Sequence, residues 1–242
     1  MSGARVIKGD VLEKFKFIPD ESIDLICTDP PYNIGVDYGF GKHEDKRKDY
    51  PEWCAEWIQQ CSRVLSAKGS IWIVSGQEFG AHIDLEMQKY FFIRNRITWY
   101  ESFGAYCRNK FGRTSRPIFY GTKKKLGFTF NRSAVTVPSD RQLKYNDKRA
   151  NPEGKVMGDV WDIARVCGTF KERIPGVPTQ LPKALVTRIV KVSSNRGDTV
   201  LDPFCGSGTV LAVSKSLGRD SLGIEQNPEY VRIAEDRIEK EG

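Results

Sequence analysis

Continuous apolar runs alternate along most of the chain with longer segments in which apolar residues recur every three or four positions. The strand-like runs, typical of strands with two buried faces, are 6–8, 23–28, 71–74, 91–99, 199–201 and 221–224. Helical spacing predicts helices over 52–66 (stopped by Gly69), over 79–90, from about 183 to 195, up to Gly218, and from Asn227 onward. Strands that alternate with helices predict a parallel sheet with right-handed crossovers.

This periodicity fades between 101 and about 160, where Arg116–Tyr120 is the one clear strand. The pattern therefore predicts a single α/β domain over 1–242, with helices on both faces of a mostly parallel sheet. We expect 1–100 and 161–242 to build the two halves of the sheet, and 101–160 to form an irregular insertion.

Composition narrows the class of protein. Hydrophobic residues make up 39% and charged residues 29% of the chain, which is ordinary for a soluble globular protein. No apolar stretch approaches the roughly 18–20 residues that cross a membrane, and the first residues lack the apolar segment of a signal peptide. We expect a cytoplasmic protein. Two histidines, and six cysteines without a C-x-x-C pair, argue against a metal site.

Charge is concentrated in one region. Residues 101–150 hold twelve lysines and arginines against three acids, a local charge of +9 in a chain whose net charge is +7. A basic block on a nearly neutral body predicts binding to a polyanion; a solvated loop is the alternative. The aromatic residues between the cations are Phe103, Tyr106, Phe111 and Tyr145. Their rings suit stacking on bases, and local packing is the alternative.

The first chemical motif is Asp29-Pro30-Pro31-Tyr32, which follows the predicted strand 23–28. In open α/β sheets, ligands bind at the carboxyl ends of the strands. Asp29 and the Pro30 carbonyl can accept hydrogen bonds from one amino group, Pro31 stiffens the turn, and Tyr32 offers a ring face. The motif predicts a site for a planar amine such as a nucleobase. A proline turn with a capping aspartate is the alternative.

The second motif lies near the C-terminus. A strand, the turn Asp202-Pro203-Phe204-Cys205-Gly206-Ser207-Gly208-Thr209, a helix and a strand ending in Glu225 form a nucleotide-binding βαβ unit. The third glycine of the dinucleotide fingerprint is replaced by Leu211. The unit therefore favours a nucleoside ligand without a pyrophosphate. Asp10, which follows the first strand, would lie at the same sheet edge or cap a short helix.

With both motifs in this order, the chain resembles the β-class amino-group DNA methyltransferases, which use S-adenosylmethionine. The resemblance implies a Rossmann-like methyltransferase fold in which 101–160 is the target-recognition region. It implies that Asp202, Phe204, Gly206 and Gly208 line the methionine end of the cofactor, that Glu225 binds its ribose, and that Asp10 lies near its adenine. The full predicted cofactor set is Asp10, Thr179, Gln180, Asp202, Phe204, Cys205, Gly206, Ser207, Gly208 and Glu225.

The chain departs from the family at Val177-Pro178-Thr179-Gln180-Leu181-Pro182, where the family often has His-Pro-Thr-Gln-Lys-Pro. Val177 and Leu181 cannot make the polar contacts of His and Lys. Lys183 is a candidate to compensate for the lost cation.

The resemblance also implies a mechanism. Asp29 and the Pro30 carbonyl would hold the amine of a flipped base, Tyr32 would stack on the base, and its nitrogen would attack the cofactor methyl in line. An aspartate at the first motif position favours adenine N6; cytosine N4 is the alternative, and an RNA methyltransferase or a non-catalytic nucleic-acid-binding protein remain further ones. Carbon-5 methylation is disfavoured because no Pro-Cys dipeptide is present.

The expected partner is DNA, with a cognate restriction enzyme as a further candidate and a monomer or homodimer as the assembly. The cations predicted to bind DNA are Arg108, Lys110, Arg113, Arg116, Lys123, Lys124 and Lys125.

Overall fold

Consecutive residues of the apolar runs are buried on opposite faces of one sheet. In β2 (Ile23–Thr28), Leu25 and Cys27 belong to one core cluster, and Ile26, between them, belongs to the other. This two-sided burial explains why the runs are continuous rather than alternating.

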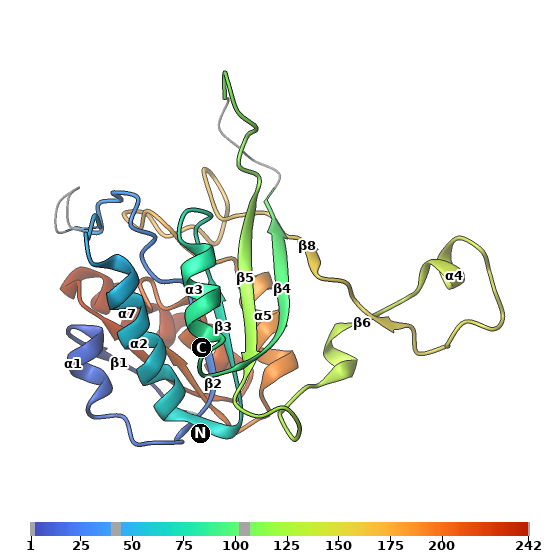
Figure 1. Ribbon diagram of the computed structural model, residues 1–242, viewed down its shortest axis with the longest axis horizontal. Helices are drawn as coiled ribbons and strands as arrows, with labels where there is room; N and C mark the ends of the chain where they lie inside the picture. The colour runs from blue at the N-terminus through green and yellow to red at the C-terminus, as the bar shows by residue number, and fades with distance from the viewer. Residues whose placement is uncertain (1–2, 40–44, 102–106, 242) are drawn as a thin grey trace.

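The computed structural model describes residues 3–39, 45–101 and 107–241 (Figure 1).

Eight strands of the described residues form the main sheet, in the order β1-β10-β9-β2-β3-β5-β4-β8. Besides β2, they are β1 (Ala4–Lys8), β3 (Leu65–Val74), β4 (Phe92–Tyr100), β5 (Ser115–Thr122), β8 (Val160–Asp162), β9 (Thr199–Asp202) and β10 (Asp220–Glu225). One face carries α1 (Val11–Phe15), α2 (Tyr50–Val64) and α3 (Gly80–Met87), and the other carries α5 (Lys183–Ser193), α6 (Thr209–Ser216) and α7 (Pro228–Glu241). No helix among these residues is both long and apolar enough to span a membrane.

The parallel part of the sheet brings the two sequence motifs to one edge. β1, β10, β9, β2 and β3 pair in parallel, so their carboxyl ends lie together. The direct pairing of β2 with β9 joins the N-terminal half to the C-terminal half. Asp29 follows β2, the glycine turn follows β9, and Glu225 ends β10. This is the sheet edge at which α/β folds bind ligands.

The prediction of a mostly parallel α/β fold is confirmed, with one departure inside 101–160. β5 pairs antiparallel with both β3 and β4, and β8 pairs with β4. The segment is therefore not entirely an irregular insertion. Ile118, Phe119 and Tyr120 are buried in the sheet, and a hairpin, not a helical crossover, joins β4 to β5.

The predicted end of the helix at Gly69 is wrong. α2 ends at Val64, because Leu65 already has an extended backbone and begins β3. Gly69 lies inside this strand, where an added Cβ would come 2.7 Å from Cδ1 of Leu65. The missing side chain at Gly69 therefore leaves room for Leu65 within the strand, and Gly69 does not end the helix.

Residues 131–158 form an arm that projects from the body (Figure 1, right). It contains η1 (Arg132–Val135), α4 (Asp140–Leu143) and the two-stranded sheet of β6 (Thr136–Val137) and β7 (Lys155–Val156). Asn131 fixes its base to the body: the Asn131 amide N–H donates to the Val192 carbonyl at 2.7 Å, and Nδ2 donates to the Ser194 carbonyl at 2.9 Å.

Candidate active site

A cavity of about 280 Å³ opens at the carboxyl edge of the parallel strands. Both sequence motifs contribute to its walls, since Asp29 and Pro31 line it from one half of the chain, and Asp202, Phe204 and Glu225 line it from the other. Folding thus brings the two motifs face to face across one cavity.

Asp29 is the acid of the first motif, and its carboxylate has a partner within the motif. The Tyr32 hydroxyl donates a hydrogen bond to Oδ1 of Asp29. Burial raises the pKa of Asp29 to about 6, against the opposing effects of the nearby Arg116 guanidinium and the Tyr32 hydrogen bond. A carboxyl group in this state is ionised at neutral pH and still able to take up a proton as the pH falls.

Arg116 completes this group of side chains, which corrects its predicted role as a DNA-binding surface cation. Its Nε donates to Glu101 Oε1 at 2.9 Å and its Nη1 to the Tyr32 hydroxyl at 3.0 Å. The guanidinium carbon lies 5.3 Å from the centre of the Tyr32 ring and 5.6 Å from that of Trp99. The sequence correctly predicted a strand over 116–120. It could not show that this strand, β5, pairs with β3, and this pairing brings Arg116 to the site.

Tyr32 differs from its predicted arrangement. Only 7% of the side chain is exposed, and a Cβ added at Gly76 would lie 3.1 Å from Tyr32 Cβ and Cγ. Its ring is thus enclosed by Gly76 and by Arg116. A base that approaches Asp29 meets a carboxylate that already accepts the Tyr32 hydroxyl on one oxygen.

The glycine turn holds the second acid, Asp202, below the cavity. Asp202 Oδ1 accepts from Thr28 Oγ1 at 2.8 Å and from the Phe204 N–H at 3.1 Å. Burial raises the pKa of Asp202 to about 7. Gly206 has φ of +47°, and no atom lies within 4 Å of an added Cβ, so its backbone opens onto the cavity.

Gly208 serves a different purpose from the one predicted. It has φ of +74°, and an added Cβ would lie 2.9 Å from the Ala234 Cβ of α7. Gly208 is absent from the cavity wall, whereas its neighbours Ser207 and Thr209 line it. The second glycine therefore allows the helix α7 to pack against the turn rather than a ligand to approach it.

Glu225 is fixed by backbone groups on both sides. Its Oε2 accepts from the Gly206 N–H at 2.9 Å, and its Oε1 accepts from the Asn227 N–H at 2.7 Å. Burial raises its pKa above the ordinary value. Each oxygen has further lone pairs, so the carboxylate can accept the two hydroxyls of a ribose from the cavity.

Asp45 is a residue that the sequence reasoning missed. Its Oδ2 accepts from the N–H groups of Ile34, Gly35 and Val36 at 3.0–3.1 Å, and its Oδ1 accepts from that of Asn33 at 3.1 Å. Four successive amides thus converge on one buried carboxylate. Asn33, at φ of +63°, and Gly35, at φ of +81°, give the backbone the curvature that such an anion nest needs.

The same loop reaches across the cavity to the other half of the chain. Tyr38 lines the cavity, and its carbonyl accepts from Asn227 Nδ2 at 2.6 Å. Asn227 also bonds Glu225, so 33–39 links the amine side to the predicted ribose side. An aspartate twelve residues after Asn33 has no local spacing that could have indicated this contact.

The segment that departs from the family pattern forms the remaining wall. Val177, Thr179 and Leu181 line the cavity, and the first and last are buried apolar contacts. Gln180 also lines it, but its side chain holds the loop, with Oε1 accepting from the Ile174 N–H and Nε2 donating to the Glu172 carbonyl. Lys183 does not line the cavity, and its Nζ lies 2.9 Å from Glu241.

The other predicted positions divide between the wall and its support. Asp10 both lines the cavity and caps α1, since its Oδ1 accepts from the Leu12 N–H at 2.9 Å. Cys205 lines the wall and is buried. Pro30 is buried behind Asp29 and is not part of the wall.

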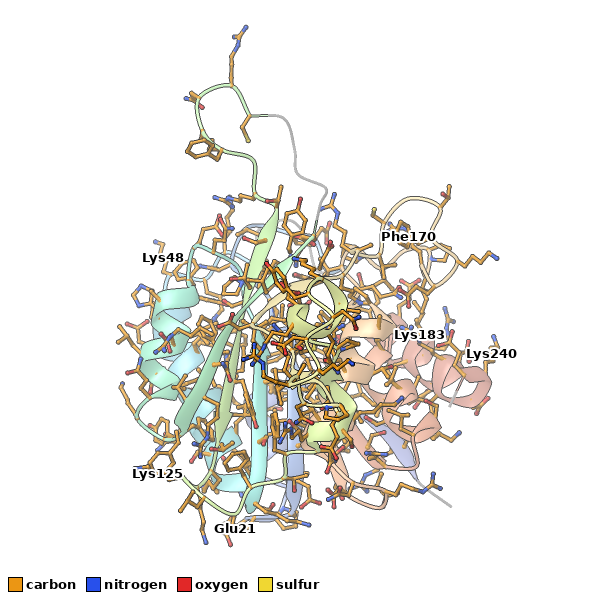
Figure 2. The ribbon with its side chains drawn as sticks, turned by 90° about the vertical axis from the view of Figure 1, so that its right-hand side faces the viewer. Glu21, Lys48, Lys125, Phe170, Lys183 and Lys240 are labelled. Carbon is orange, nitrogen blue, oxygen red and sulfur yellow. The ribbon has the colours of Figure 1, made fainter. Side chains whose placement is uncertain are left out.

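The predicted DNA-binding cations separate into two groups. Arg108, Lys110 and Arg113 are exposed on the β4–β5 hairpin loop, above the edge that carries the cavity. Lys123, Lys124 and Lys125 follow β5, which runs antiparallel, and lie at the opposite edge; Figure 2 shows Lys125 there, beside Glu21. Lys123 Nζ is also engaged by the Ser62 hydroxyl at 3.1 Å. Residues 123–125 and 108–113 therefore lie on different surfaces, and the DNA binding of either group stays a prediction.

The chemistry of the wall fits a cationic nucleoside. Asp10, Asp29, Asp45, Asp202 and Glu225 surround a space whose apolar contacts include Phe204, Val210 and Ile224. S-Adenosylmethionine carries a positive sulfur, an amine and a ribose, and these match the acids. Within the described residues, no group of three or more His, Cys, Asp or Glu side chains could hold a metal ion.

Comparison with known proteins gives consistent matches over nearly the whole chain. The model of a DNA methylase family matches residues 23–236. DNA adenine methyltransferase YhdJ of Escherichia coli is 41% identical over 243 residues, covering 97% of this chain and 82% of YhdJ. Type II methyltransferase M.HpaI of Haemophilus parainfluenzae is 38% identical over 240 residues, covering 98% and 74%. The structure of TTHA0409 of Thermus thermophilus complexed with S-adenosyl-L-methionine has a TM-score of 0.69 at 25% identity, covering 98% and 95%.

Proposed function

The chain belongs to the DNA methylase family, and we propose that it transfers a methyl group from S-adenosylmethionine to the N6 amine of adenine in DNA. The observation that carries this proposal is the meeting of Asp29 and Glu225 at one cavity, where an amine acceptor and a ribose acceptor share a wall. Adenine is favoured over cytosine by the name of the 41% identical relative, an adenine methyltransferase.

When bound, S-adenosylmethionine supplies a methyl group on a positively charged sulfur. Glu225 would accept the ribose hydroxyls, while Asp202 and the open backbone at Gly206 would hold the methionine end. The acids around the cavity favour this charged sulfur over the uncharged sulfur that remains after transfer.

Asp29 accepts one N–H bond of the target amine, and the Pro30 carbonyl, which does not line the cavity in the free protein, accepts the other once the base has entered. Hydrogen bonds to a charged acceptor are the stronger kind, and they direct the nitrogen lone pair away from Asp29. The nitrogen lone pair would form the new bond to the methyl carbon as the carbon–sulfur bond breaks and leaves its electron pair on sulfur, and the nitrogen would then lose one of its protons. Asp29, with its pKa near 6, can take up this proton and return it to water.

Arg116 and Glu101 position these groups without touching the reacting atoms. The guanidinium holds the Tyr32 ring and hydroxyl through Nη1, and Glu101 fixes the guanidinium from the other side. On arrival of a base, the Tyr32 hydroxyl releases Asp29 and keeps its hydrogen bond from Arg116. Tyr32 thus holds one oxygen of Asp29 in place until a flipped base arrives.

The arm and the hairpin loop are the proposed DNA contacts. The arm carries the exposed cations Arg132, Arg141, Lys144, Lys148, Arg149 and Lys155, and the hairpin carries Arg108, Lys110 and Arg113. Relatives such as M.HpaI are named type II methyltransferases, and this favours a cognate restriction enzyme as a functional partner.

Incubation of the protein with genomic DNA and methyl-labelled cofactor, followed by nucleoside analysis, tests the proposal. We expect the label in N6-methyladenine. Label in N4-methylcytosine would replace adenine with the alternative base, and label in a parallel RNA sample but not in DNA would replace the substrate class. Absence of label in every nucleic acid would contradict the proposed activity.

A further inference from the structure

One large apolar side chain stands outside the body at the edge that carries the active site. Phe111 is 98% exposed, on the hairpin loop between β4 and β5. Residues 107–114 of this loop rise beyond the sheet above its carboxyl edge (Figure 1, top). An aromatic ring held in water costs free energy that burial against another surface would recover.

The neighbours of Phe111 indicate what that surface is. Arg108, Lys110 and Arg113 are exposed on the same short loop. An apolar ring among cations matches a polyanion with an apolar interior, which is the chemistry of a base-paired duplex. Proteins that distort DNA insert phenylalanine and similar wedges between base pairs.

The base of the loop fixes it to the active site. The Glu101 N–H donates to the Thr114 carbonyl at 2.8 Å, and Gln77 Nε2 donates to the Ser115 carbonyl at 2.9 Å. Arg113 forms an ion pair with Glu78. Glu101 and Arg116 flank this closure and form the network that holds Tyr32.

From this arrangement we propose that Phe111 is a wedge that enters the base stack and fills the space left by the flipped target base. This inference rests on the proposed DNA methyltransferase function and names a residue that serves base extrusion. Phe111 is a positioning residue, since the wedge acts on the duplex and the chemistry stays with Asp29.

The test separates extrusion from chemistry by changing the strand opposite the target. Two duplexes carry the sequence methylated by the wild-type protein, one fully paired and one with an abasic site opposite the target base. The abasic duplex has a target that is already unpaired and needs little help to leave the stack. Single-turnover methyl transfer is measured on both. The fluorescence of 2-aminopurine, which has no N6 amine, is measured on a second pair of duplexes that carry it at the target position.

We expect Phe111→Ala to slow transfer about tenfold or more on the paired duplex and to leave the abasic duplex close to the wild-type rate. The rise in 2-aminopurine fluorescence should be lost with the paired duplex, and Phe111→Trp should restore both readouts. Phe17→Ala is the matched control, because Phe17 is 75% exposed and lies beside Ile23, at the edge opposite the active site.

An equal loss on both duplexes, or a normal rate on the paired duplex, would overturn the wedge. Such a result leaves the proposed function intact, since the wild-type protein would still methylate DNA. A wild-type protein that methylates no DNA, so that no target sequence exists for the two duplexes, would instead overturn the proposed function, and the wedge with it.

Discussion

At the scale of single residues, the active site depends on how one carboxylate is shared. Asp29 is bonded to Tyr32 in the free protein, yet the chemistry requires it to hold an amine. Arg116 resolves this conflict, because it gives the Tyr32 hydroxyl a second partner at 3.0 Å. The sequence motif predicted the residues Asp29 and Tyr32, but it contained nothing about the cation from β5 that sets their geometry.

Replacing Asp29 with alanine should abolish most methyl transfer while cofactor binding stays measurable. Removal of one preorganised electrostatic contact costs about 2.7–4 kcal/mol in the transition state, a factor of roughly 10²–10³. The check is single-turnover transfer measured beside cofactor affinity by calorimetry. Normal turnover by Asp29→Ala would contradict the mechanism, and loss of cofactor binding would place Asp29 on the cofactor instead.

The pH dependence of kcat/KM should report Asp29, because this quantity follows the ionisation of the free enzyme. Acceptance of the amine requires the carboxylate, so kcat/KM should fall as the pH drops through about 6, the raised pKa of Asp29. Arg116 lowers that pKa, so Arg116→Gln should move the fall to higher pH.

Arg96→Gln is the control for this shift. Arg96 is an exposed cation on β4, with an ion pair to Asp84 at 2.7 Å, and its loss should leave the profile unchanged. A profile that is the same in Arg116→Gln and the wild-type protein would show that Arg116 has no electrostatic influence on Asp29. The other groups near this carboxylate are Glu101, Tyr32, Tyr38, Cys27 and Asp202.

At the scale of elements, local patterns predicted what local forces decide. The buried runs and helical stripes placed the βα units, and two motifs placed the edge at which a ligand binds. The antiparallel position of β5 was not predictable in this way, because a hairpin and a crossover use the same apolar residues. The same limit applies to Asp45, whose four amide partners lie nine to twelve residues earlier along the chain.

Asp45→Ala should release the loop 33–39 and weaken cofactor binding more than it weakens the fold. Each hydrogen bond to a charged group contributes about 1.5–3 kcal/mol, but the freed amides of a surface loop regain water. We expect at least a tenfold loss of cofactor affinity, about 1.4 kcal/mol, measured by calorimetry with thermal unfolding as the parallel readout. Asp37→Ala, in the same loop but exposed, is the control; unchanged affinity in Asp45→Ala would show that the nest does not shape the cavity.

At the scale of the whole molecule, the sequence located positive charge in the chain but not in space. Residues 101–150 run through a hairpin loop at the active edge, a strand inside the sheet, a turn at the opposite edge and the projecting arm. One basic block in the sequence therefore becomes three separate surfaces. Residues 107–114 lie beyond the edge of the sheet that carries the cavity, and the arm extends the reach of the molecule beyond its body.

The proposed DNA contact of the arm can be tested against the cations at the opposite edge. Lys148 and Lys155 are exposed on the arm, and Lys124 and Lys125 are exposed after β5 at the opposite edge of the sheet. A protein that neutralises phosphates releases counterions, so log K falls as log salt rises. Each lost phosphate contact makes this fall less steep by about 0.9. Reversal of both arm lysines to glutamate should therefore weaken DNA binding and flatten the slope by about 2, whereas Lys124→Glu with Lys125→Glu should change neither.

Anisotropy titrations of labelled duplex across a salt series measure both the affinity and the slope. The opposite pattern, with loss only from the 124–125 pair, would mean that DNA crosses the far edge and that the arm binds something else.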